Sequence, residues 1–485
     1  MIRSLLCLSS ALSLSVLTAF PTKAASPETV LESKLRAIEA ILDTQLAHES
    51  VPGAAFGIVA DQDLVWSHTY GIQDLQSRMP VDEDTAFSIC SISKLFTGIA
   101  VMDLDERGLI DIDAPITTYL GADGGAADDV TVRNLLSHVS GLPREGETDF
   151  WFTNQFPDDA TLLADVSGRT DWYAPYDHWQ YSNLGMAALG QVIQSASGQS
   201  FHDYVEARIL NPLGMDNTTT DMPFDIVGQG FARGYYVRDP KGNRQPVEPH
   251  EFDAFASAAG VASSVNDMAR FMAWHFRLRD SEAEEILQPE TLKTMQRVHW
   301  TGEDFDEPAW GLAYATRRLN GKTLWGHGGY CPGTVAQMTM RNPDKVGVVM
   351  MATANDVSSG GLSSMIHAMV RDDVKTVYID SSDDEADDSE DSAAEDSASF
   401  AEFEGRYDRP NYHWSVYIGQ TSDGLFAVPL YANRPHEDVD MFRHEDGDIF
   451  IRKRDDGSDA EPLRFIRDAS GNIVSVVSGG YRLLR

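Results

Sequence analysis

The sequence contains few cysteines and few basic residues, and both shortages limit what the chain can be. Three cysteines occur among 485 residues, and Cys7 lies in an N-terminal apolar run, so Cys90 and Cys331 alone remain for the mature chain. Lysine and arginine number 38 against 75 aspartate and glutamate, which gives a formal net charge of −37. Because nucleic acid is a polyanion, we expect no nucleic-acid partner.

Two further absences concern cofactors and membranes. The chain has no His-Glu-x-x-His motif, no paired-cysteine motif and no glycine-rich phosphate motif, so we expect neither a metal nor a nucleotide cofactor. After the first 24 residues no apolar run reaches membrane-spanning length, so we expect no membrane span. Residues 1–24 resemble a secretory signal, with Arg3, an apolar core and a small-residue cleavage site that ends at Ala24. They predict a protein exported to the periplasm or secreted.

Residues 380–399 form an acidic segment with no basic and no large apolar residue. Such a composition predicts a disordered, self-repelling linker between two domains. The first domain then covers residues 25–379 and the second residues 400–485. In the second, short strand-like runs are broken by Gly, Asp and Asn, which is typical of a small antiparallel barrel or sandwich. Of the two we expect a lipocalin-like β-barrel.

The first domain has a mixed α/β pattern. Residues 54–71 predict a β-hairpin, residues 323–353 a second group of strands, and residues 361–373 a last helix. These strands lie far apart in the sequence, so they must pair in one sheet. Residues 105–310 predict a helix-rich insertion. The expected fold is therefore an antiparallel sheet flanked by helices, with a helix-rich insertion and a small all-β barrel after it.

Ser91 and Lys94 are three residues apart at the start of a predicted helix that ends at Gly108. Residues at this spacing share one face of a helix, so the Lys94 amine can reach the Ser91 hydroxyl. A serine hydroxyl becomes a good nucleophile when an adjacent base takes its proton. Lysine can act as that base if burial or neighbouring positive charge lowers its pKa from about 10.4. Ser-x-x-Lys also arises by chance, so the motif needs support from elsewhere.

That support comes from two further motifs. Tyr181 and Asn183 form a Tyr-x-Asn triplet before a second amphipathic helix, and His327, Gly328 and Gly329 form a His-x-Gly triplet in a strand. Tyr-x-Asn recurs at Tyr431, so the order and spacing of the three motifs carry the argument. In this order they resemble the signatures of the serine β-lactamase and penicillin-binding-protein superfamily. The segments LLSHVSGLP, NPLGMDNTT, GVASSVNDMARFM and GHGGYCPG resemble class C β-lactamase-like serine hydrolases, of the esterase or D-aminopeptidase type, across about residues 28–378.

The resemblance implies a role for each motif residue. Ser91 would be the acylated nucleophile, and Lys94 and Tyr181 the pair that transfers its proton. Asn183 would bind the substrate amide. His327, Gly328 and Gly329 would form the strand edge along which the substrate lies. The backbone N–H groups of Ser91 and Tyr330 would form the oxyanion hole, in which each donor contributes about 2.7–4 kcal/mol.

The third motif departs from the β-lactamase pattern. His327 replaces the usual lysine, and Gly328 removes a hydroxyl that would contact a β-lactam carboxylate. A histidine with its ordinary pKa near 6.5 is only partly charged at neutral pH. We therefore expect poor β-lactamase activity. We also expect Lys94 and Tyr181, rather than His327, to govern the pH dependence with uncharged substrates.

Aromatic residues gather in the insertion, near the Tyr-x-Asn motif. Tyr176 stands where relatives commonly have glycine. The neighbouring aromatic residues predict either an aromatic pocket for the acyl group of a substrate or packing in the core, and for most of them we expect core packing. These residues are Trp151, Phe152, Trp172, Tyr173 and Trp179.

Cys331 raises two questions. It lies in a Gly-x-Cys-x-Gly sequence that mimics a nucleophile elbow, but an elbow leads from a strand into a helix and this segment leads into another strand. Cys90 and Cys331 each adjoin a predicted catalytic motif. A disulfide needs a Cα separation of about 4.4–6.8 Å, which neighbouring motifs do not guarantee. The sequence therefore favours two free thiols while leaving a disulfide open.

The motifs together predict an exported serine hydrolase that forms an acyl-enzyme on small esters or on peptides and amides with D-residues. The alternatives are a D,D-carboxypeptidase or weak β-lactamase acting on cell-wall fragments, and a non-catalytic receptor for β-lactams or peptidoglycan. A receptor would have lost Ser91, Lys94 or Tyr181, and all three are present. The oligomeric state does not follow from the sequence.

Overall fold

The computed structural model describes residues 25–121, 129–146, 150–168, 173–248, 250–301, 309–383, 400–409, 414–432, 434–453, 459–478 and 481–485. The predicted signal segment, residues 1–24, lies outside the described residues. So does the predicted linker from residue 384 to residue 399. The first linker residues, Asp380–Asp383, form a short 3-10 helix that continues from the preceding helical segment.

Seven strands of the described chain form one antiparallel sheet in the order β2-β1-β9-β8-β7-β6-β5. The predicted hairpin is β1 and β2, and β1 also pairs with β9, from the other end of the domain. The expectation that distant strands share one sheet is confirmed. The strands are β1 (Gly53–Ala60), β2 (Asp63–Gly71), β5 (Ala309–Trp310), β6 (Ala315–Leu319), β7 (Lys322–Cys331), β8 (Thr334–Arg341) and β9 (Val346–Ala352).

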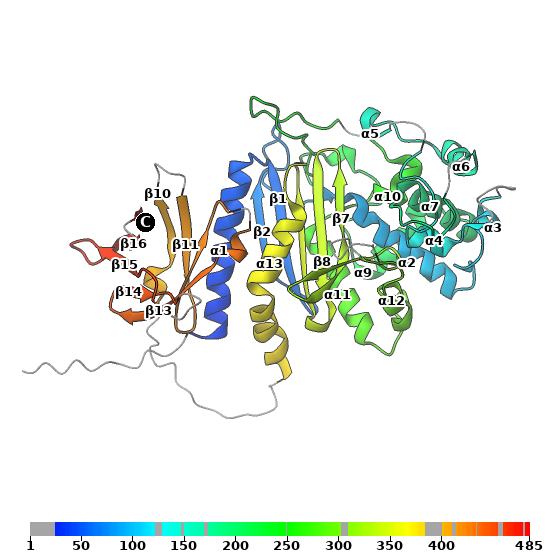
Figure 1. Ribbon diagram of the computed structural model, residues 1–485. Helices are drawn as coiled ribbons and strands as arrows, with labels where there is room; N and C mark the ends of the chain where they lie inside the picture. Colours follow the sequence, from blue (N-terminus) through cyan, green and yellow to red (C-terminus); the bar gives the residue numbers. More distant parts are fainter. Residues whose placement is uncertain are drawn as a thin grey trace, which may run out of the picture.

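Helices cover both faces of this sheet (Figure 1). Successive side chains of a strand point to opposite faces, and β1 is buried along its whole length. Phe56 and Ile58 belong to the apolar cluster with α1 and α13, whereas Ala55 and Val59 belong to the cluster with α2 and α11. These four helices are α1 (Pro27–His48), α2 (Ser93–Glu106), α11 (Val265–Asp280) and α13 (Ser359–Val374).

The predicted helix-rich insertion lies beyond α2, at the end of the molecule that holds α3, α4 and α7 in Figure 1. It packs through α7 against α2 and α10. Its described helices are α3 (Thr117–Leu120), α4 (Val132–Leu136), α5 (Phe150–Thr153), α6 (Asp159–Gly168), α7 (Asn183–Ser197), α8 (Phe201–Val205), α9 (Asn211–Leu213), α10 (Ala256–Ala259) and α12 (Pro289–Met295).

The C-terminal part is a closed antiparallel barrel of eight strands. Its interior is filled by apolar and aromatic side chains, among them Phe403, Phe450 and Phe465. The strands are β10 (Gly405–Arg409), β11 (Trp414–Gln420), β12 (Gly424–Pro429), β13 (Asp440–Asp446), β14 (Ile449–Ile451), β15 (Leu463–Arg467), β16 (Ile473–Ser478) and β17 (Tyr481–Leu484).

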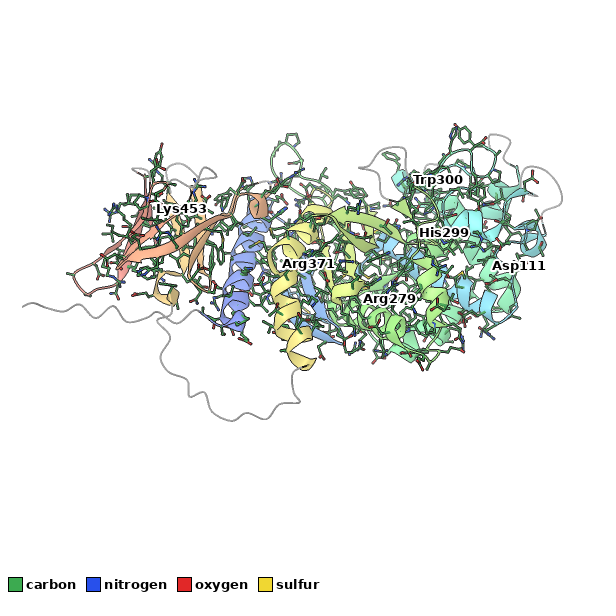
Figure 2. The ribbon with its side chains drawn as sticks, turned by 60° about the horizontal axis from the view of Figure 1, so that its bottom comes forward. Asp111, Arg279, His299, Trp300, Arg371 and Lys453 are labelled. Atoms are coloured by element: carbon green, nitrogen blue, oxygen red, sulfur yellow. A yellow bond between two sulfur atoms is a disulfide. The ribbon has the colours of Figure 1, made fainter. Side chains whose placement is uncertain are left out.

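The barrel packs on α1, so this helix lies between the barrel and the sheet (Figure 1). Tyr417 and Phe426 of the barrel join the apolar cluster of α1 and α13. Lys453 of the barrel and Asp111, which follows α2, lie at opposite ends of the molecule (Figure 2). The barrel therefore docks on the sheet face opposite to α2.

Candidate active site

Ser91 lies in a tight 3-10 turn, Cys90–Ile92, directly before α2, rather than within the first α-helical turn. Cys90 adopts a left-handed backbone conformation with φ of 51°. The Ser93 hydroxyl fixes the turn because it donates to the Cys90 carbonyl at 2.5 Å and accepts the N–H of Val261 at 2.9 Å. The turn leaves Ser91 partly exposed, while its neighbours Cys90 and Ile92 are buried.

Lys94 is fully buried beneath Ser91. Its Nζ donates to Ser91 Oγ at 3.0 Å and to the carbonyl of Ala258 at 2.7 Å. Burial lowers the pKa of Lys94 well below its ordinary value, because the charged form loses hydration. A neutral amine held against a hydroxyl can accept its proton, which is the function that the i, i+3 spacing indicates.

Tyr181 contacts the same serine from the other side. The Ser91 side chain acts on the pKa of the Tyr181 phenol, and the ring centroid of Tyr181 lies 5.0 Å from Lys94 Nζ. Burial raises the pKa of Tyr181 above its ordinary value, so the phenol stays protonated at neutral pH. Ser91 thus lies between an amine whose burial favours its neutral form and a protonated phenol, which together can carry one proton toward a leaving group.

His327 to Tyr330 lie at the end of β7, antiparallel to β8. A Cβ atom on Gly329 would stand 2.2 Å from the carbonyl oxygen of Ile89, so glycine alone allows β7 to approach the Ser91 turn this closely. The adjacent residue is Tyr330, whose side chain is 66% exposed. Its backbone N–H is therefore brought to the same turn as that of Ser91, where an oxyanion hole would require it.

A disulfide joins Cys90 and Cys331, whose Cα atoms are 5.7 Å apart. The preference for two free thiols was wrong, because the close approach of β7 to the Ser91 turn brings the two residues into bonding range. The bond ties the turn that carries Ser91 to the strand that carries Tyr330. It also removes Cys331 as a rival nucleophile, and the Gly-x-Cys-x-Gly segment forms the turn from β7 to β8 rather than an elbow.

His327 does not have the ordinary pKa that its sequence context implied. It is 4% exposed, and its Nδ1 donates to the carbonyl of Gly328 at 2.6 Å. Burial lowers the pKa of His327 to about 3. The imidazole is neutral at all working pH values, so the partial positive charge expected at neutrality is absent.

Asn183 begins α7, and its amide nitrogen donates to Glu145 Oε1 at 2.6 Å. The Arg144 guanidinium lies 3.4 Å from the same carboxylate and 4.8 Å from the centre of the Tyr181 ring. Burial raises the pKa of Glu145. Sequence reasoning missed the Arg144–Glu145 pair, although it directly follows the LLSHVSGLP segment.

His138, within that segment, is the second residue that sequence reasoning missed. It is fully buried, its ring centroid lies 4.5 Å from that of Tyr181, and its Nδ1 accepts the N–H of Ser182 at 3.2 Å. Accepting through Nδ1 leaves the proton on Nε2, which is buried without a hydrogen-bond partner. Burial keeps the pKa of His138 far below its ordinary value. The neutral ring supports Tyr181 from behind.

The aromatic residues of the insertion do not form one pocket. Trp179 stacks on Trp310 at 5.2 Å, beside Tyr181, whereas Trp151 packs among Phe150, Phe156 and Phe252. Phe152 and Tyr173 are exposed, and Trp172 lies outside the described residues.

Tyr176 has a left-handed backbone with φ of 68°, the conformation for which relatives commonly use glycine. Its side chain is exposed.

Within the described part of the chain, no group of three or more His, Cys, Asp and Glu side chains is arranged to hold a metal ion. Across the same residues, none of the helices has the length and apolar character needed to span a bilayer.

Comparison with known proteins shows what the chain resembles. The family model described as Beta-lactamase matches residues 38–362. Beta-lactamase-like protein 2 of Dictyostelium discoideum is 27% identical over 345 residues, covering 68% of this chain and 61% of that protein. Esterase EstB of Burkholderia gladioli is 28% identical over 344 residues, covering 62% of this chain and 83% of that protein. The match spans 61%, 35% and 63% of the first three curated relatives, which is less than two thirds of their length.

Solved structures share the fold of both parts. The octameric penicillin-binding protein homologue from Pyrococcus abyssi superposes with a TM-score of 0.63 at 21% identity, covering 93% of this chain and 100% of that one. A D-stereospecific amidohydrolase from Streptomyces has a TM-score of 0.57 at 22% identity, covering 70% of this chain and 98% of that one. At these identities the likeness concerns the fold alone.

Proposed function

The chain belongs to the Beta-lactamase family of serine hydrolases, and from that premise we propose that it is an exported hydrolase that forms an acyl-enzyme on Ser91. Its substrates are small esters, or amides and peptides that carry D-residues. The observation that carries this proposal is the position of Ser91 Oγ, 3.0 Å from the amine of Lys94, which is buried, has a lowered pKa and lies 5.0 Å from the centre of the Tyr181 ring.

Each step of the reaction has a group suited to it. Lys94 accepts the Ser91 proton as Oγ attacks the acyl carbonyl, and the N–H groups of Ser91 and Tyr330 stabilise the oxyanion. The proton passes through Tyr181 to the leaving alcohol or amine as its bond to the carbonyl carbon breaks. Water, deprotonated by the same pair, then attacks the carbonyl carbon of the ester formed on Ser91. The bond from that carbon to Oγ breaks, the acid is released, and the pair returns the proton to Ser91 Oγ.

The third motif favours uncharged substrates. His327 is neutral and Gly328 has no hydroxyl, so neither supplies a charge or hydroxyl donor to a substrate carboxylate. Esterase EstB, among the relatives, is named for ester hydrolysis, which agrees with this preference. The alternative is a D,D-carboxypeptidase or weak β-lactamase, in which the exposed Arg144 beside Tyr181 would bind the substrate carboxylate.

Labelling and a substrate panel test the proposal. A fluorophosphonate should add its mass to the peptide carrying Ser91, and Ser91→Ala should abolish labelling. The purified protein should hydrolyse p-nitrophenyl esters faster than acyl-D-Ala-D-Ala peptides or nitrocefin. Labelling on another residue would refute the nucleophile, and faster turnover of nitrocefin or of the carboxylate-terminated peptides would favour the alternative.

A further inference from the structure

The third motif brings no positive charge to the candidate active site. His327 stands where the β-lactamase pattern has a lysine, and burial lowers its pKa to about 3, so the ring is neutral. Its centroid lies 6.0 Å from the centroid of the Tyr181 ring. The proton transfer through Tyr181 therefore lacks the cation that a lysine at this position would place beside it.

Arg144 brings a cation to Tyr181 from a different part of the chain. Its guanidinium carbon lies over the Tyr181 ring, 4.8 Å from the centroid. A guanidinium is a permanent cation, and the face of an aromatic ring attracts it. The attraction grows when the phenol oxygen gains negative charge, because opposite charges then interact at short distance. Tyr181 thus has a positive charge beside it that does not depend on His327.

The segment that carries Arg144 is bonded to the Tyr-x-Asn motif. The carbonyl of Arg144 accepts the N–H of Asn183 at 2.8 Å, at the start of α7. The hydroxyl of Ser182 donates to the carbonyl of Pro143 at 2.7 Å. These bonds join the neighbours of Tyr181 to the backbone on both sides of the Pro143–Arg144 peptide. The start of the Arg144 side chain is therefore fixed relative to the Tyr181 ring.

Glu145 opposes part of the Arg144 charge. Its Oε1 lies 3.4 Å from Arg144 Nε and accepts the side-chain amide of Asn183 at 2.6 Å. Burial is the largest cause of the low pKa of Lys94, the Glu145 charge raises that pKa, and the Arg144 charge lowers it. Burial raises the pKa of Tyr181, while the same two charges act on it in these same directions. Arg144 and Glu145 therefore influence both groups that transfer the proton.

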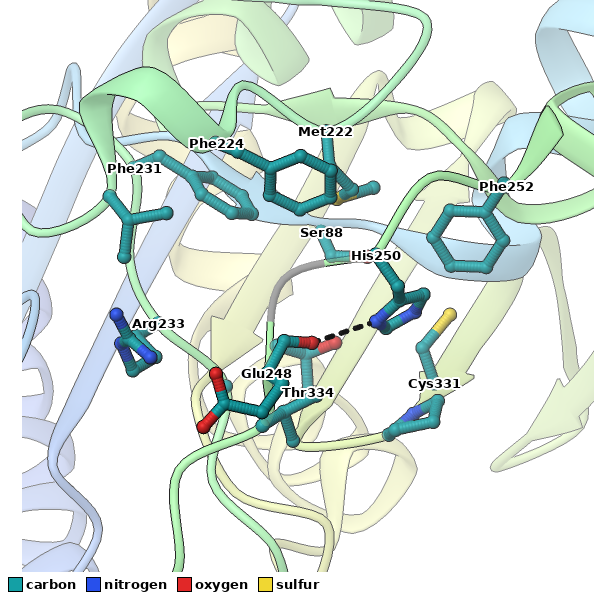
Figure 3. Close-up of a pocket in the computed structure, with 14 residues that line it drawn as sticks. Ser88, Met222, Phe224, Phe231, Arg233, Glu248, His250, Phe252, Cys331 and Thr334 are labelled. Carbon is teal, nitrogen blue, oxygen red and sulfur yellow. Dashed lines mark hydrogen bonds between the residues drawn. The ribbon is translucent and has the colours of Figure 1, made fainter. Parts of the chain in front are cut away.

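Four titratable or charged side chains of the described residues surround the pair that transfers the proton; they are His138, His327, Arg144 and Glu145. Burial lowers the pKa of both histidines, so neither is charged at neutral pH. The guanidinium of Arg233 lines a separate pocket, shown in Figure 3, and lies 3.7 Å from Asp74. The residues that transfer the proton do not line that pocket. The cation beside the pair is therefore Arg144.

We propose that Arg144 is a positioning residue for the hydrolysis and supplies, beside Tyr181, the positive charge that the third motif lacks. Its charge stabilises the phenol oxygen while Tyr181 gives its proton to the leaving group and takes the proton held by Lys94. It also favours the neutral form of the Lys94 amine, and Glu145 reduces both effects. This inference rests on the proposed acyl-enzyme function and adds the charge that sets the pH range of the site.

The test measures kcat/KM against pH with p-nitrophenyl acetate, which has no carboxylate. Lys94 accepts a proton only when neutral, and loss of a nearby cation raises its pKa. In Arg144→Gln the pH at which activity is lost on the acid side should therefore rise by about 0.5–1 unit. At neutral pH kcat/KM should fall about threefold to tenfold, mostly in kcat. Arg144→Lys keeps a cation and should lie between the wild type and Arg144→Gln.

Glu145→Gln should shift the profile in the opposite direction. The substitution removes the negative charge and keeps an oxygen that can accept the amide of Asn183. The pH at which activity is lost on the acid side should fall by about half a unit. The double variant Arg144→Gln/Glu145→Gln should have a profile close to that of the wild type. A general disturbance of the loop would not produce shifts of opposite sign that cancel.

Arg277→Gln is the matched control. Arg277 is also an exposed arginine paired with a glutamate, since its Nε donates to Glu285 at 2.8 Å on the surface of α11. The pH profile of this variant should be that of the wild type, with kcat/KM within about twofold. Thermal melting shows whether each variant folds. If Arg144→Gln does not fold, Arg144→Lys and Glu145→Gln decide.

The possible failures are distinguishable. Profiles that do not move in Arg144→Gln and Glu145→Gln, with acetate turnover and labelling of Ser91 in the wild type, would overturn the role of Arg144 and leave the proposed function standing. An unmoved profile with a raised KM for acyl-D-Ala-D-Ala peptides would instead assign Arg144 to binding the substrate carboxylate. Absence of both labelling and acetate turnover in the wild type would refute the proposed function itself.

Discussion

The candidate active site and the barrel bury different kinds of side chain. Around Ser91, Lys94, His138 and His327 are at most 4% exposed, and the Nε2 atoms of both histidines have no hydrogen-bond partner. The barrel interior is built from apolar and aromatic side chains such as Phe450 and Phe465, which pack edge to face at 5.7 Å. Each buried unpaired polar group costs about 1–3 kcal/mol, whereas each buried aromatic ring stabilises the fold.

The comparison indicates that the buried polar groups near Ser91 lower the stability of the fold, while their burial adjusts the reactivity of the candidate active site. Burial favours the neutral form of the Lys94 amine and keeps the Tyr181 phenol protonated, which are the states that proton transfer needs. The barrel has a packed core and docks on α1, away from the candidate active site. Changes in the candidate active site should therefore alter rate more than stability, and changes in the barrel interface should do the reverse.

The largest effect is expected at Lys94. Lys94→Met removes the proposed base, so kcat/KM on the best ester should fall about 10²- to 10⁴-fold. An apolar side chain of similar length suits the buried site, so the free energy of unfolding should stay within about 1 kcal/mol. Steady-state kinetics and urea denaturation measure both quantities. Lys293→Met, on the partly exposed side of α12, is the control. Severe destabilisation with intact activity would reverse the comparison.

His138 should come next. His138→Leu leaves the Ser182 N–H without its acceptor and Tyr181 without its supporting ring, so kcat/KM should fall about 10- to 100-fold, mostly in kcat. Asparagine can accept the same N–H and tolerates the φ of 58° found at this position. His138→Asn should therefore retain more activity than His138→Leu. Equal losses in the two variants would mean that the acceptor at Nδ1 does not matter.

The pH dependence follows from the shifted pKa of Lys94. The amine accepts a proton only when neutral, and its folded-state pKa is lowered, so activity is present above that pKa and lost as pH falls through it. On an uncharged ester, kcat/KM should fall about tenfold per pH unit below the Lys94 pKa. His327, with a pKa of about 3, should add no step near pH 6.5. A wild-type optimum below about pH 6 would contradict this assignment.

How much the sequence could predict differs between local and tertiary features. The i, i+3 spacing indicates that Lys94 reaches Ser91, and the strand patterns indicate the strands of the first domain and of the barrel, because these depend on short-range periodicity. The ring contact between His138 and Tyr181 and the hydrogen bond from Asn183 to Glu145 each join residues of two different loops. No local sequence pattern predicts how those loops pack together.

The disulfide and the low pKa of His327 are also tertiary features that no local sequence pattern predicts. The pairing of Cys90 with Cys331 required the close approach that Gly329 allows, and the low pKa of His327 required its burial. Side-chain burial at a specific site is a property of the assembled fold, so an ordinary pKa was the best assumption available from sequence.

The disulfide is expected to affect stability by a moderate amount. It spans 241 positions of the sequence, and loss of such a bond typically costs about 2–4 kcal/mol because the unfolded chain gains freedom. The double variant Cys90→Ala/Cys331→Ala should show this loss in urea denaturation. Two titratable thiols in the denatured, unreduced wild type would show that the bond is absent.

The smallest effect is expected where the barrel meets α1. Arg36 of α1 pairs with Glu404, whose side chain is 8% exposed and also accepts from the Tyr417 hydroxyl at 2.7 Å. Arg36→Ala leaves that carboxylate with one partner fewer, so the free energy of unfolding should fall by about 1 kcal/mol. Arg434→Ala, which breaks the exposed Arg434–Glu437 pair, should change it by less. Because α1 covers the sheet face opposite to α2, kcat/KM should stay within about twofold of the wild type in both variants. If Arg36→Ala lowers kcat/KM tenfold without unfolding the protein, the barrel interface is coupled to the candidate active site and the two regions are not independent.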